Sequence, residues 1–382
     1  MTRTLGLASV CGVGVALAAG CGGGGAAGRA EAAFLDSASF TRAEYAAAPR
    51  LPLTRLYSIC EGGRTPECQF RSISEAALAA GRRVLLSQVG AVAQEFDSTG
   101  RWSGPLGRLG AGPGEYRRAM AVGFDSAGGV AVFDQMGFRV VRFDDHRRVA
   151  WTVNVGFVPE FNGVSLKGGR VVEWLVPGSD TLGSIVVSQF VLVDSAGRRE
   201  AFASVPTKAV RARGSDLMPV PPPFTAHPVW DVGPGLSVVF SPGDRVRIER
   251  YGGGGVAELL IEGDVALREV TPAEVAEHLD RGLRRLEGMP GEAQLREAAR
   301  HAPAFHPAIT RVAVLADGSI WATGSPASES DSTRYDVFSR DGRLAGFVML
   351  PAEARVIDGD ATIVLVTAVD SAGAPFAALY RR

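Results

Sequence analysis

Histidine, asparagine and cysteine are scarce in this chain of 382 residues. It contains five His, four Cys and two Asn, Asn154 and Asn162. Together with carboxylates, these side chains provide most of the ligands in protein metal centres. The sequence therefore offers few residues from which a catalytic metal site could be built, and we expect no cofactor, with a divalent cation as the alternative.

An excess of charge of either sign is also absent. Lys and Arg number 40 and Asp and Glu number 41, and no block of like charge occurs along the chain. Proteins that bind nucleic acid need clustered cations to neutralise phosphates. This balance argues against a nucleic-acid partner.

The common catalytic signatures are missing. No Gly-x-Ser-x-Gly elbow, nucleotide-binding glycine loop or His-Glu-x-x-His helix occurs in a usable context. The glycines of Gly107 to Gly110 do not form a phosphate cradle, because neither a Lys nor a helix start follows them.

The chain begins with an export signal. A basic start precedes an apolar stretch from Leu5 to Gly20, which is too short for a typical membrane span, and small residues lead to Cys21. This pattern resembles the bacterial lipobox, with Ala18 in place of the usual Leu, and implies that Cys21 is lipidated and becomes the new N-terminus. An ordinary signal peptide cut elsewhere is the alternative. We expect residues 1–21 to be the lipoprotein signal and residues 22–50 a flexible tether.

Export changes the interpretation of the remaining cysteines. Cys60 and Cys68 flank a short loop containing Gly62, Gly63 and Pro66. In an oxidising compartment, two thiols at this spacing favour a disulfide, whereas a metal site would need more ligands.

From about Ile73 onward, short apolar runs alternate with Gly and Asp turns, which is typical of antiparallel strands. One unit of about 40 to 50 residues recurs six times. Its third strand is the easiest to locate: Val92 to Phe96, Arg139 to Phe143, Phe190 to Val193, Arg245 to Arg250, Tyr335 to Phe338 and Pro375 to Tyr380.

Four-stranded units at this spacing predict an all-β, six-bladed β-propeller over residues 51–382. The last unit has only three strands before the chain ends. Because a bare sheet edge is unfavourable, we expect the run Leu53 to Ser58 to supply the fourth strand and close the ring.

The stretch Gly107 to Tyr116 connects the first unit to the second. With the turn and strand Asp317 to Trp321 and the truncated last unit, it resembles exported six-bladed β-propeller proteins related to NHL repeats. Many of these are bacterial lipoproteins. The resemblance covers about residue 50 to residue 382 and implies the fold more strongly than an activity.

Three long interblade connections should gather on one face of such a ring: Gly107 to Tyr116, Pro206 to Phe224 and Gly263 to Pro307. The third, over about residues 264–305, is predicted to be helical, because Thr271-Pro272-Ala273-Glu274 forms a capping box. The helices could form a lid on the propeller rim or a docking surface for a partner.

Two histidines occupy matching positions. His227-Pro228 and His306-Pro307 precede the inner strands of blades four and five, so both could approach the channel mouth. His can act there as a base or metal ligand, or it can simply cap the packing of a Pro-containing loop. Carboxylates are expected on the same face, as a cation or sugar site or as hydrated loop residues, at Asp134, Asp180, Asp244, Glu329 and Asp331.

The sequence thus predicts a lipid-anchored envelope propeller that acts as a non-catalytic binding or protein-interaction module through its looped face. The alternative is a lactonase-like hydrolase or lyase, in which a metal could take part, with its site at the channel mouth. We expect a monomer whose partner is an envelope protein or a small ligand such as a carbohydrate. Gly22 after the cysteine favours the outer membrane, on its periplasmic or surface side.

Overall fold

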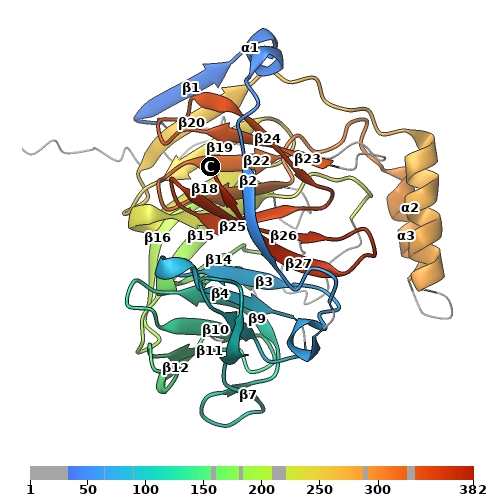
Figure 1. Cartoon of the computed structure of the whole chain (residues 1–382). Coiled ribbons are helices and arrows are strands. Elements are labelled where there is room, and N and C mark those ends of the chain that lie inside the picture. Colours follow the sequence, from blue (N-terminus) through green and yellow to red (C-terminus); the bar gives the residue numbers. More distant parts are fainter. Residues whose placement is uncertain are drawn as a thin grey trace, which may run out of the picture. The chain divides into compact units, whose positions relative to one another are not determined.

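The computed structural model describes residues 33–382 except 64, 89, 156–160, 180–183, 209–220, 287–290 and 325–331. Six blades follow one another along the chain and form a ring, which confirms the predicted six-bladed β-propeller (Figure 1). The four strands of each blade are antiparallel to their neighbours, and the first strand of each repeating unit is innermost.

The first three blades contain consecutive strands. Blade one consists of β3 (Glu75–Leu78), β4 (Val84–Ser87), β5 (Gln94–Phe96) and β6 (Trp102–Pro105). Blade two consists of β9 (Ala119–Phe124), β10 (Val130–Asp134), β11 (Arg139–Phe143) and β12 (Val149–Asn154). Blade three consists of β13 (Phe161–Ser165), β14 (Val171–Leu175), β15 (Ile185–Val193) and β16 (Arg199–Lys208).

The last three blades complete the ring. Blade four consists of β17 (Val229–Gly233), β18 (Ser237–Ser241), β19 (Arg247–Tyr251) and β20 (Ala257–Gly263). Blade five consists of β21 (Arg311–Val314), β22 (Ile320–Thr323), β23 (Ser332–Phe338) and β24 (Leu344–Pro351). Blade six contains β25 (Arg355–Gly359), β26 (Ile363–Val369) and β27 (Pro375–Arg381).

The hydrophobic core lies between the blades. Six buried clusters each combine residues of two neighbouring blades. Second strands are apolar on both faces because each blade is covered by a neighbour on either side. All five residues of β10 are buried, for example, and so are Ile363 to Ala368 of β26.

An N-terminal strand closes the ring, as the missing fourth strand of blade six predicted. β2 (Thr54–Ile59) pairs antiparallel with β27 as the outer strand of blade six. Its last residue, Ile59, is 1% exposed and packs in the cluster between blades six and one. Both ends of the propeller chain therefore meet in one sheet.

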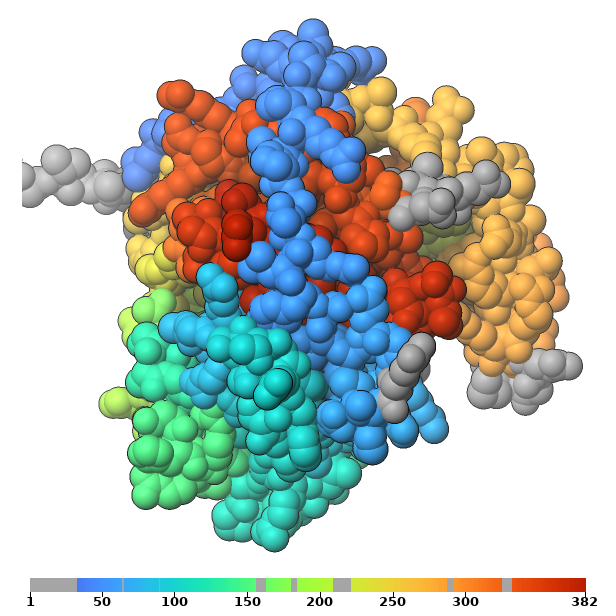
Figure 2. Space-filling model, viewed as in Figure 1, coloured from blue at the N-terminus to red at the C-terminus, as the bar shows by residue number. Residues whose placement is uncertain are grey.

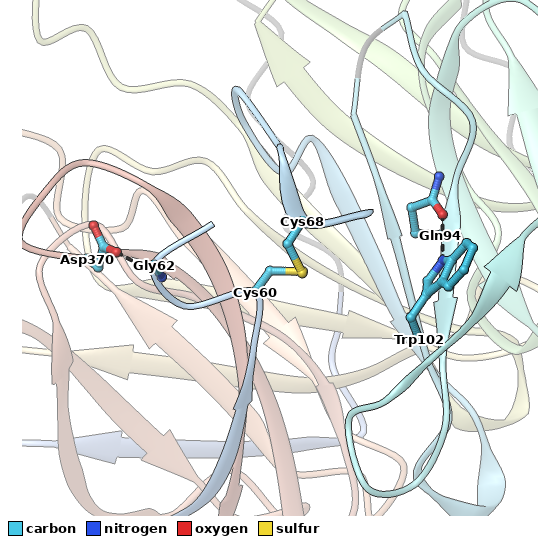
Figure 3. The surroundings of a disulfide bond; sticks show 6 residues. All are labelled: Cys60, Gly62, Cys68, Gln94, Trp102 and Asp370. Carbon is cyan, nitrogen blue, oxygen red and sulfur yellow. Dashed lines mark hydrogen bonds between the residues drawn. A yellow bond between two sulfur atoms is a disulfide. The ribbon is translucent and has the colours of Figure 1, made fainter. Parts of the chain in front are cut away.

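The Cys60–Cys68 disulfide follows β2 directly, and its formation confirms the pairing expected from the sequence. Figure 3 shows it at the start of the connection from blade six to blade one. In the same connection the Gly62 N–H donates to Asp370 Oδ2 at 3.1 Å, which ties the loop to the turn between β26 and β27. The bridge thus secures the segment where the ring is joined.

The chain between residues 36 and 50 differs from the expected tether. β1 (Asp36–Phe40) adds to blade four as a fifth strand, parallel to β20, and α1 (Arg42–Ala47) follows with a capping box. Phe40 is buried against Phe338, which explains why this segment is ordered against the propeller. Figure 2 shows the blue N-terminal segment lying across the surface of the last blades.

The glycine-rich connection from blade one to blade two has a defined shape. Two short parallel strands, β7 (Arg108–Leu109) and β8 (Glu115–Tyr116), form within it. The Tyr116 ring is fully buried, its hydroxyl donates to the Leu106 carbonyl at 2.5 Å, and it accepts from the Ala93 N–H. Gly107 has a φ of 68° and lies so close to the Gly114 carbonyl that a side chain would clash.

The insertion between blades four and five is helical. It contains α2 (Pro272–Arg285) and α3 (Glu292–Arg300), and the predicted capping box between Thr271 and Glu274 is present. The helices pack on each other where Gly282 meets Leu295, and Figure 1 shows the pair projecting from the ring. Four 3-10 turns complete the described structure: η1 (Pro66–Cys68), η2 (Ala80–Arg82), η3 (Lys167–Gly169) and η4 (Pro234–Leu236).

Candidate functional site

The candidate site lies along the channel bordered by the inner strands. We define the looped face as the face that carries the interblade connections and the loops between second and third strands. Each inner strand starts at this face and ends at the opposite one, because the connection from the preceding blade enters there. Residues before or at the start of an inner strand therefore lie at the mouth of the channel on the looped face.

A cavity of about 530 Å³, here called the mouth cavity, opens at the looped face. It is lined by residues of the segment before β3 and by the starts of β21 and β25. The residues that matter for its chemistry are Arg71, Ser72, Thr310, Arg311, Glu353 and Arg355.

The mouth cavity carries an excess of positive charge. Arg71, Arg311 and Arg355 form no ion pair with any of the residues that the structure describes. Although Arg311 keeps an accessible surface in the channel, desolvation by the surrounding protein lowers the pKa of its guanidinium, and repulsion from Arg355 lowers it further. The two guanidinium groups are thus close enough to repel each other.

Glu75, the first residue of β3, lines a second, deeper cavity and interacts electrostatically with Arg311 and Arg355 of the mouth cavity. Burial raises the pKa of its carboxyl to about 7, while Arg355 and Arg311 pull it down and Asp231 pushes it up. The charge of the Glu75 carboxyl is therefore influenced both by the two arginines of the mouth cavity and by Asp231. Near neutral pH, Glu75 can change its charge with small changes in its surroundings.

The deeper space, here called the inner cavity, has a volume of about 190 Å³ and is lined by Glu75, Lys167, Asp231 and Asp358. Lys167 Nζ lies 2.7 Å from Asp231 Oδ2 and 3.9 Å from Asp358 Oδ1. It also donates to the Val314 carbonyl, and Asp231 Oδ2 accepts from the Val314 N–H at 2.7 Å. These contacts join blades three, four, five and six across the channel.

Lys167 stays charged in this position. Burial disfavours its ammonium form, but the carboxylates of Asp231 and Asp358 outweigh that cost and raise the pKa of Lys167. Burial raises the pKa of Asp358, and Lys167 offsets only part of the effect. Each of the three side chains keeps only about a fifth of its surface accessible, so the cluster resembles a buried ion pair rather than a surface one.

Glu75→Gln is expected to stabilise the protein at alkaline pH. The carboxyl titrates near 4.5 in the unfolded chain and at about 7 in the folded protein, so folding favours its protonated form and the wild type loses stability as pH rises through this window. Gln imitates the protonated carboxyl, so the variant should gain on the order of 2 kcal/mol at about pH 8 and almost nothing at about pH 4.

Urea unfolding of both proteins at the two pH values checks this prediction, with the exposed Glu200→Gln as the matched control. A gain that is equal at both pH values would mean that the carboxyl of Glu75 is not the titrating group.

The structure places the two predicted histidines in different surroundings. His306 is 4% exposed, its ring lies 4.7 Å from that of Phe224, and its Nε2 is 3.3 Å from a carboxylate oxygen of Glu274 at the start of α2. This arrangement fixes the helical insertion to the loop before β17. His227 is exposed. No group of three or more His, Cys, Asp or Glu suited to a metal ion occurs in the described part of the chain.

The predicted carboxylates also have local partners. Asp134 is fully buried and accepts from the N–H groups of Arg117 and Arg118 at 3.1 Å each. Asp244 lies 3.7 Å from Lys208 at the surface. Asp180, Glu329, Asp331 and the proposed lipidation site Cys21 lie outside the described residues.

The charged channel residues were not singled out from the sequence. Lys167 and Asp358 belong to turns recognised only as hairpin signals, and Glu75 and Arg311 start strands whose other residues are mostly apolar. The sequence did contain a usable signal, namely charged residues on the predicted innermost strands. Such a side chain must face either the channel or a neighbouring blade.

Comparisons with known proteins identify no family. No family model matches the chain, and no curated protein sequence matches it. None of the helices in the described ranges is long and apolar enough to cross a membrane.

Solved structures nevertheless share the fold. A putative exported protein of Bacteroides fragilis matches with a TM-score of 0.52 and 11% identity over 91% of this chain and 99% of that one. A member of the DUF4221 family from Bacteroides vulgatus matches with a TM-score of 0.50 and 8% identity, over 87% and 96% of the two chains. At these identities the likeness shows the fold alone, and the six sheets establish that fold as a six-bladed β-propeller.

Proposed function

We propose that the protein is a lipid-anchored envelope propeller that acts as a non-catalytic binding module through its looped face. The observation that carries this proposal is the mouth cavity. Its volume of about 530 Å³ falls in the range of about 300–1,000 Å³ typical of small-ligand sites. It opens on the face where the long connections and the helical insertion also lie, which is where rigid scaffolds usually present binding residues.

The contacts of His306 do not favour a catalytic role for this side chain. The ring of His306 packs against Phe224 and contacts the carboxylate of Glu274, so it helps to hold α2 in place. A hydrolase or lyase that used His306 would need this ring free to act as a base or ligand. We therefore propose binding of a small ligand, with an envelope protein as a further partner of the same face.

A variant that narrows the mouth cavity tests the binding function. Ser72 is exposed within the cavity, so Ser72→Trp should fill part of it without disturbing a buried contact. Native mass spectrometry of protein purified from its own envelope should show a bound small molecule on the wild type and on the control Ser37→Trp, which lies on the exposed outer strand β1. Identical spectra for the wild type and Ser72→Trp would contradict the proposal.

The lipid anchor makes a separate prediction. Cys21→Ala removes the only thiol at the expected cleavage position, so the variant should leave the membrane fraction or remain unprocessed. Fractionation of cell envelopes, with the mass of the mature N-terminus, measures this. An unchanged membrane fraction for Cys21→Ala would refute acylation at this residue.

A further inference from the structure

We propose that the mouth cavity binds a small molecule through an anionic group, a carboxylate or a phosphate, held between Arg311 and Arg355. The inference rests on the proposed binding function and names its ligand class. Glu75, which lines the inner cavity and interacts electrostatically with both arginines, is the internal counter-charge with which that anionic group competes.

The guanidinium groups of Arg311 and Arg355 have no carboxylate partner among the described residues. Several partly enclosed arginines elsewhere in the blades have a carboxylate partner: Arg139 lies 3.4 Å from Asp134, and Arg199 lies 2.9 Å from Glu173. Arg355 is also partly enclosed, yet neither it nor Arg311 has an ion pair within the described part of the chain. Two neighbouring cations without a partner are stabilised when an anion binds between them.

The described lining of the mouth cavity holds more cations than anions. Arg71 adds a third cation to the lining, and Glu353 is the only carboxylate that the described lining contributes. Glu353 attracts Arg311 but forms no ion pair with it in the described residues. The cavity therefore carries a net positive charge, which favours an anionic ligand over a neutral one.

Glu75 interacts with charged groups of both cavities. The charged groups that face it are Arg311 of β21 and Arg355 of β25 on the mouth side, and Asp231, Lys167 and Asp358 on the inner side. Lys167 is already satisfied by Asp231, so only the mouth arginines remain for the Glu75 carboxylate. When Glu75 is protonated, both arginines are available to a ligand, and when it is ionised it competes. Affinity for an anion should therefore fall as pH rises through about 7.

The size of the cavity sets a limit on the ligand. Its volume of about 530 Å³ is much larger than a sulfate or phosphate ion, so the charged group would be one end of a larger molecule. The planar guanidinium fork binds carboxylate and phosphate equally well. An acidic sugar and a phosphorylated small molecule both satisfy this description.

Calorimetric titration with sulfate and with glucuronate tests the inference, because both probes keep a constant charge between about pH 6 and about pH 8. The purified wild type should bind at least one of them, severalfold more tightly at the lower pH. Arg311→Met and Arg355→Met should each weaken binding by about tenfold or more, whereas Arg343→Met, an exposed arginine paired with Asp341, should have no effect. Glu75→Gln should bind as tightly at the higher pH as at the lower.

The two probes distinguish the ligand sources: sulfate binding indicates a phosphorylated ligand, and glucuronate binding an acidic sugar. Binding of neither probe, or equal affinity in wild type, Arg311→Met and Arg355→Met, would overturn the inference. If Ser72→Trp nevertheless lost the native ligand, the binding function would still be supported, and only the anionic nature of the ligand would be refuted. If Ser72→Trp kept the native ligand and the two arginine variants also bound the probes like the wild type, both the binding function and its anionic class would be refuted.

Discussion

Lys167→Met is expected to lower the free energy of unfolding by about 3–5 kcal/mol at neutral pH, which is the usual cost of removing one partner from a buried ion pair. The variant leaves Asp231 and Asp358 facing each other in the inner cavity without their cation. It also removes the contact from blade three to the Val314 carbonyl of blade five. Because burial raises the pKa of Asp358, protonation can neutralise this carboxyl, and the deficit should shrink as pH falls.

Denaturant unfolding across this pH range measures the effect. Lys208→Met is the matched control, since Lys208 and its partner Asp244 are both exposed and such a pair contributes little. Adding Asp231→Asn to Lys167→Met should recover part of the loss, as expected for coupled sites. A loss no larger than that of Lys208→Met would contradict the description of the inner cavity as a cross-channel ion-pair cluster.

Ile59→Asp is expected to abolish cooperative folding or to destabilise the ring by about 4 kcal/mol or more, because it buries an unpaired charge in a packed interface. Ile59 belongs to a buried cluster that also contains Leu86 and Phe96 of blade one and Leu365 and Leu379 of blade six. The substitution therefore acts at the point where β2 joins the first and last blades.

Circular dichroism and thermal unfolding check this prediction, with Leu35→Asp as the control. Leu35 is 78% exposed near the start of β1, so a charge there should be tolerated. If Ile59→Asp unfolded at the same temperature as Leu35→Asp, the closure of blade six by β2 would not be required for stability.

Much of the fold could be predicted from the sequence because propeller blades are built from local signals. Repeated Gly and Asp turns mark the hairpins, and the observed strands β11 (Arg139–Phe143) and β27 (Pro375–Arg381) agree with the predicted ones within a residue. The last repeating unit has only three strands, and a bare sheet edge is unfavourable. The sequence therefore predicted that the segment observed as β2 pairs with this unit. β1 escaped prediction because its pairing partner, β20, lies more than 200 residues away and nothing local marks a parallel fifth strand.

The candidate site was less predictable because it depends on which residues meet across the channel. His227 and His306 hold equivalent sequence positions, yet one is exposed and the other is buried beside Phe224. Glu75, Arg311 and Arg355 are separated by more than 40 residues from one another and come together only once the ring closes. Their types are ordinary in sequence, and only the absence of ion pairs in the described structure makes them informative.

Crystals grown with selenate at about pH 6 would test the central claim, that the looped face binds an anion at the channel mouth, most directly. Selenate stands in for sulfate, and its selenium can be located by anomalous scattering. The account predicts an anomalous peak in the mouth cavity within hydrogen-bond distance of Arg311 and Arg355. Selenate found only at other positions, with Arg311 and Arg355 contacting water alone, would contradict it.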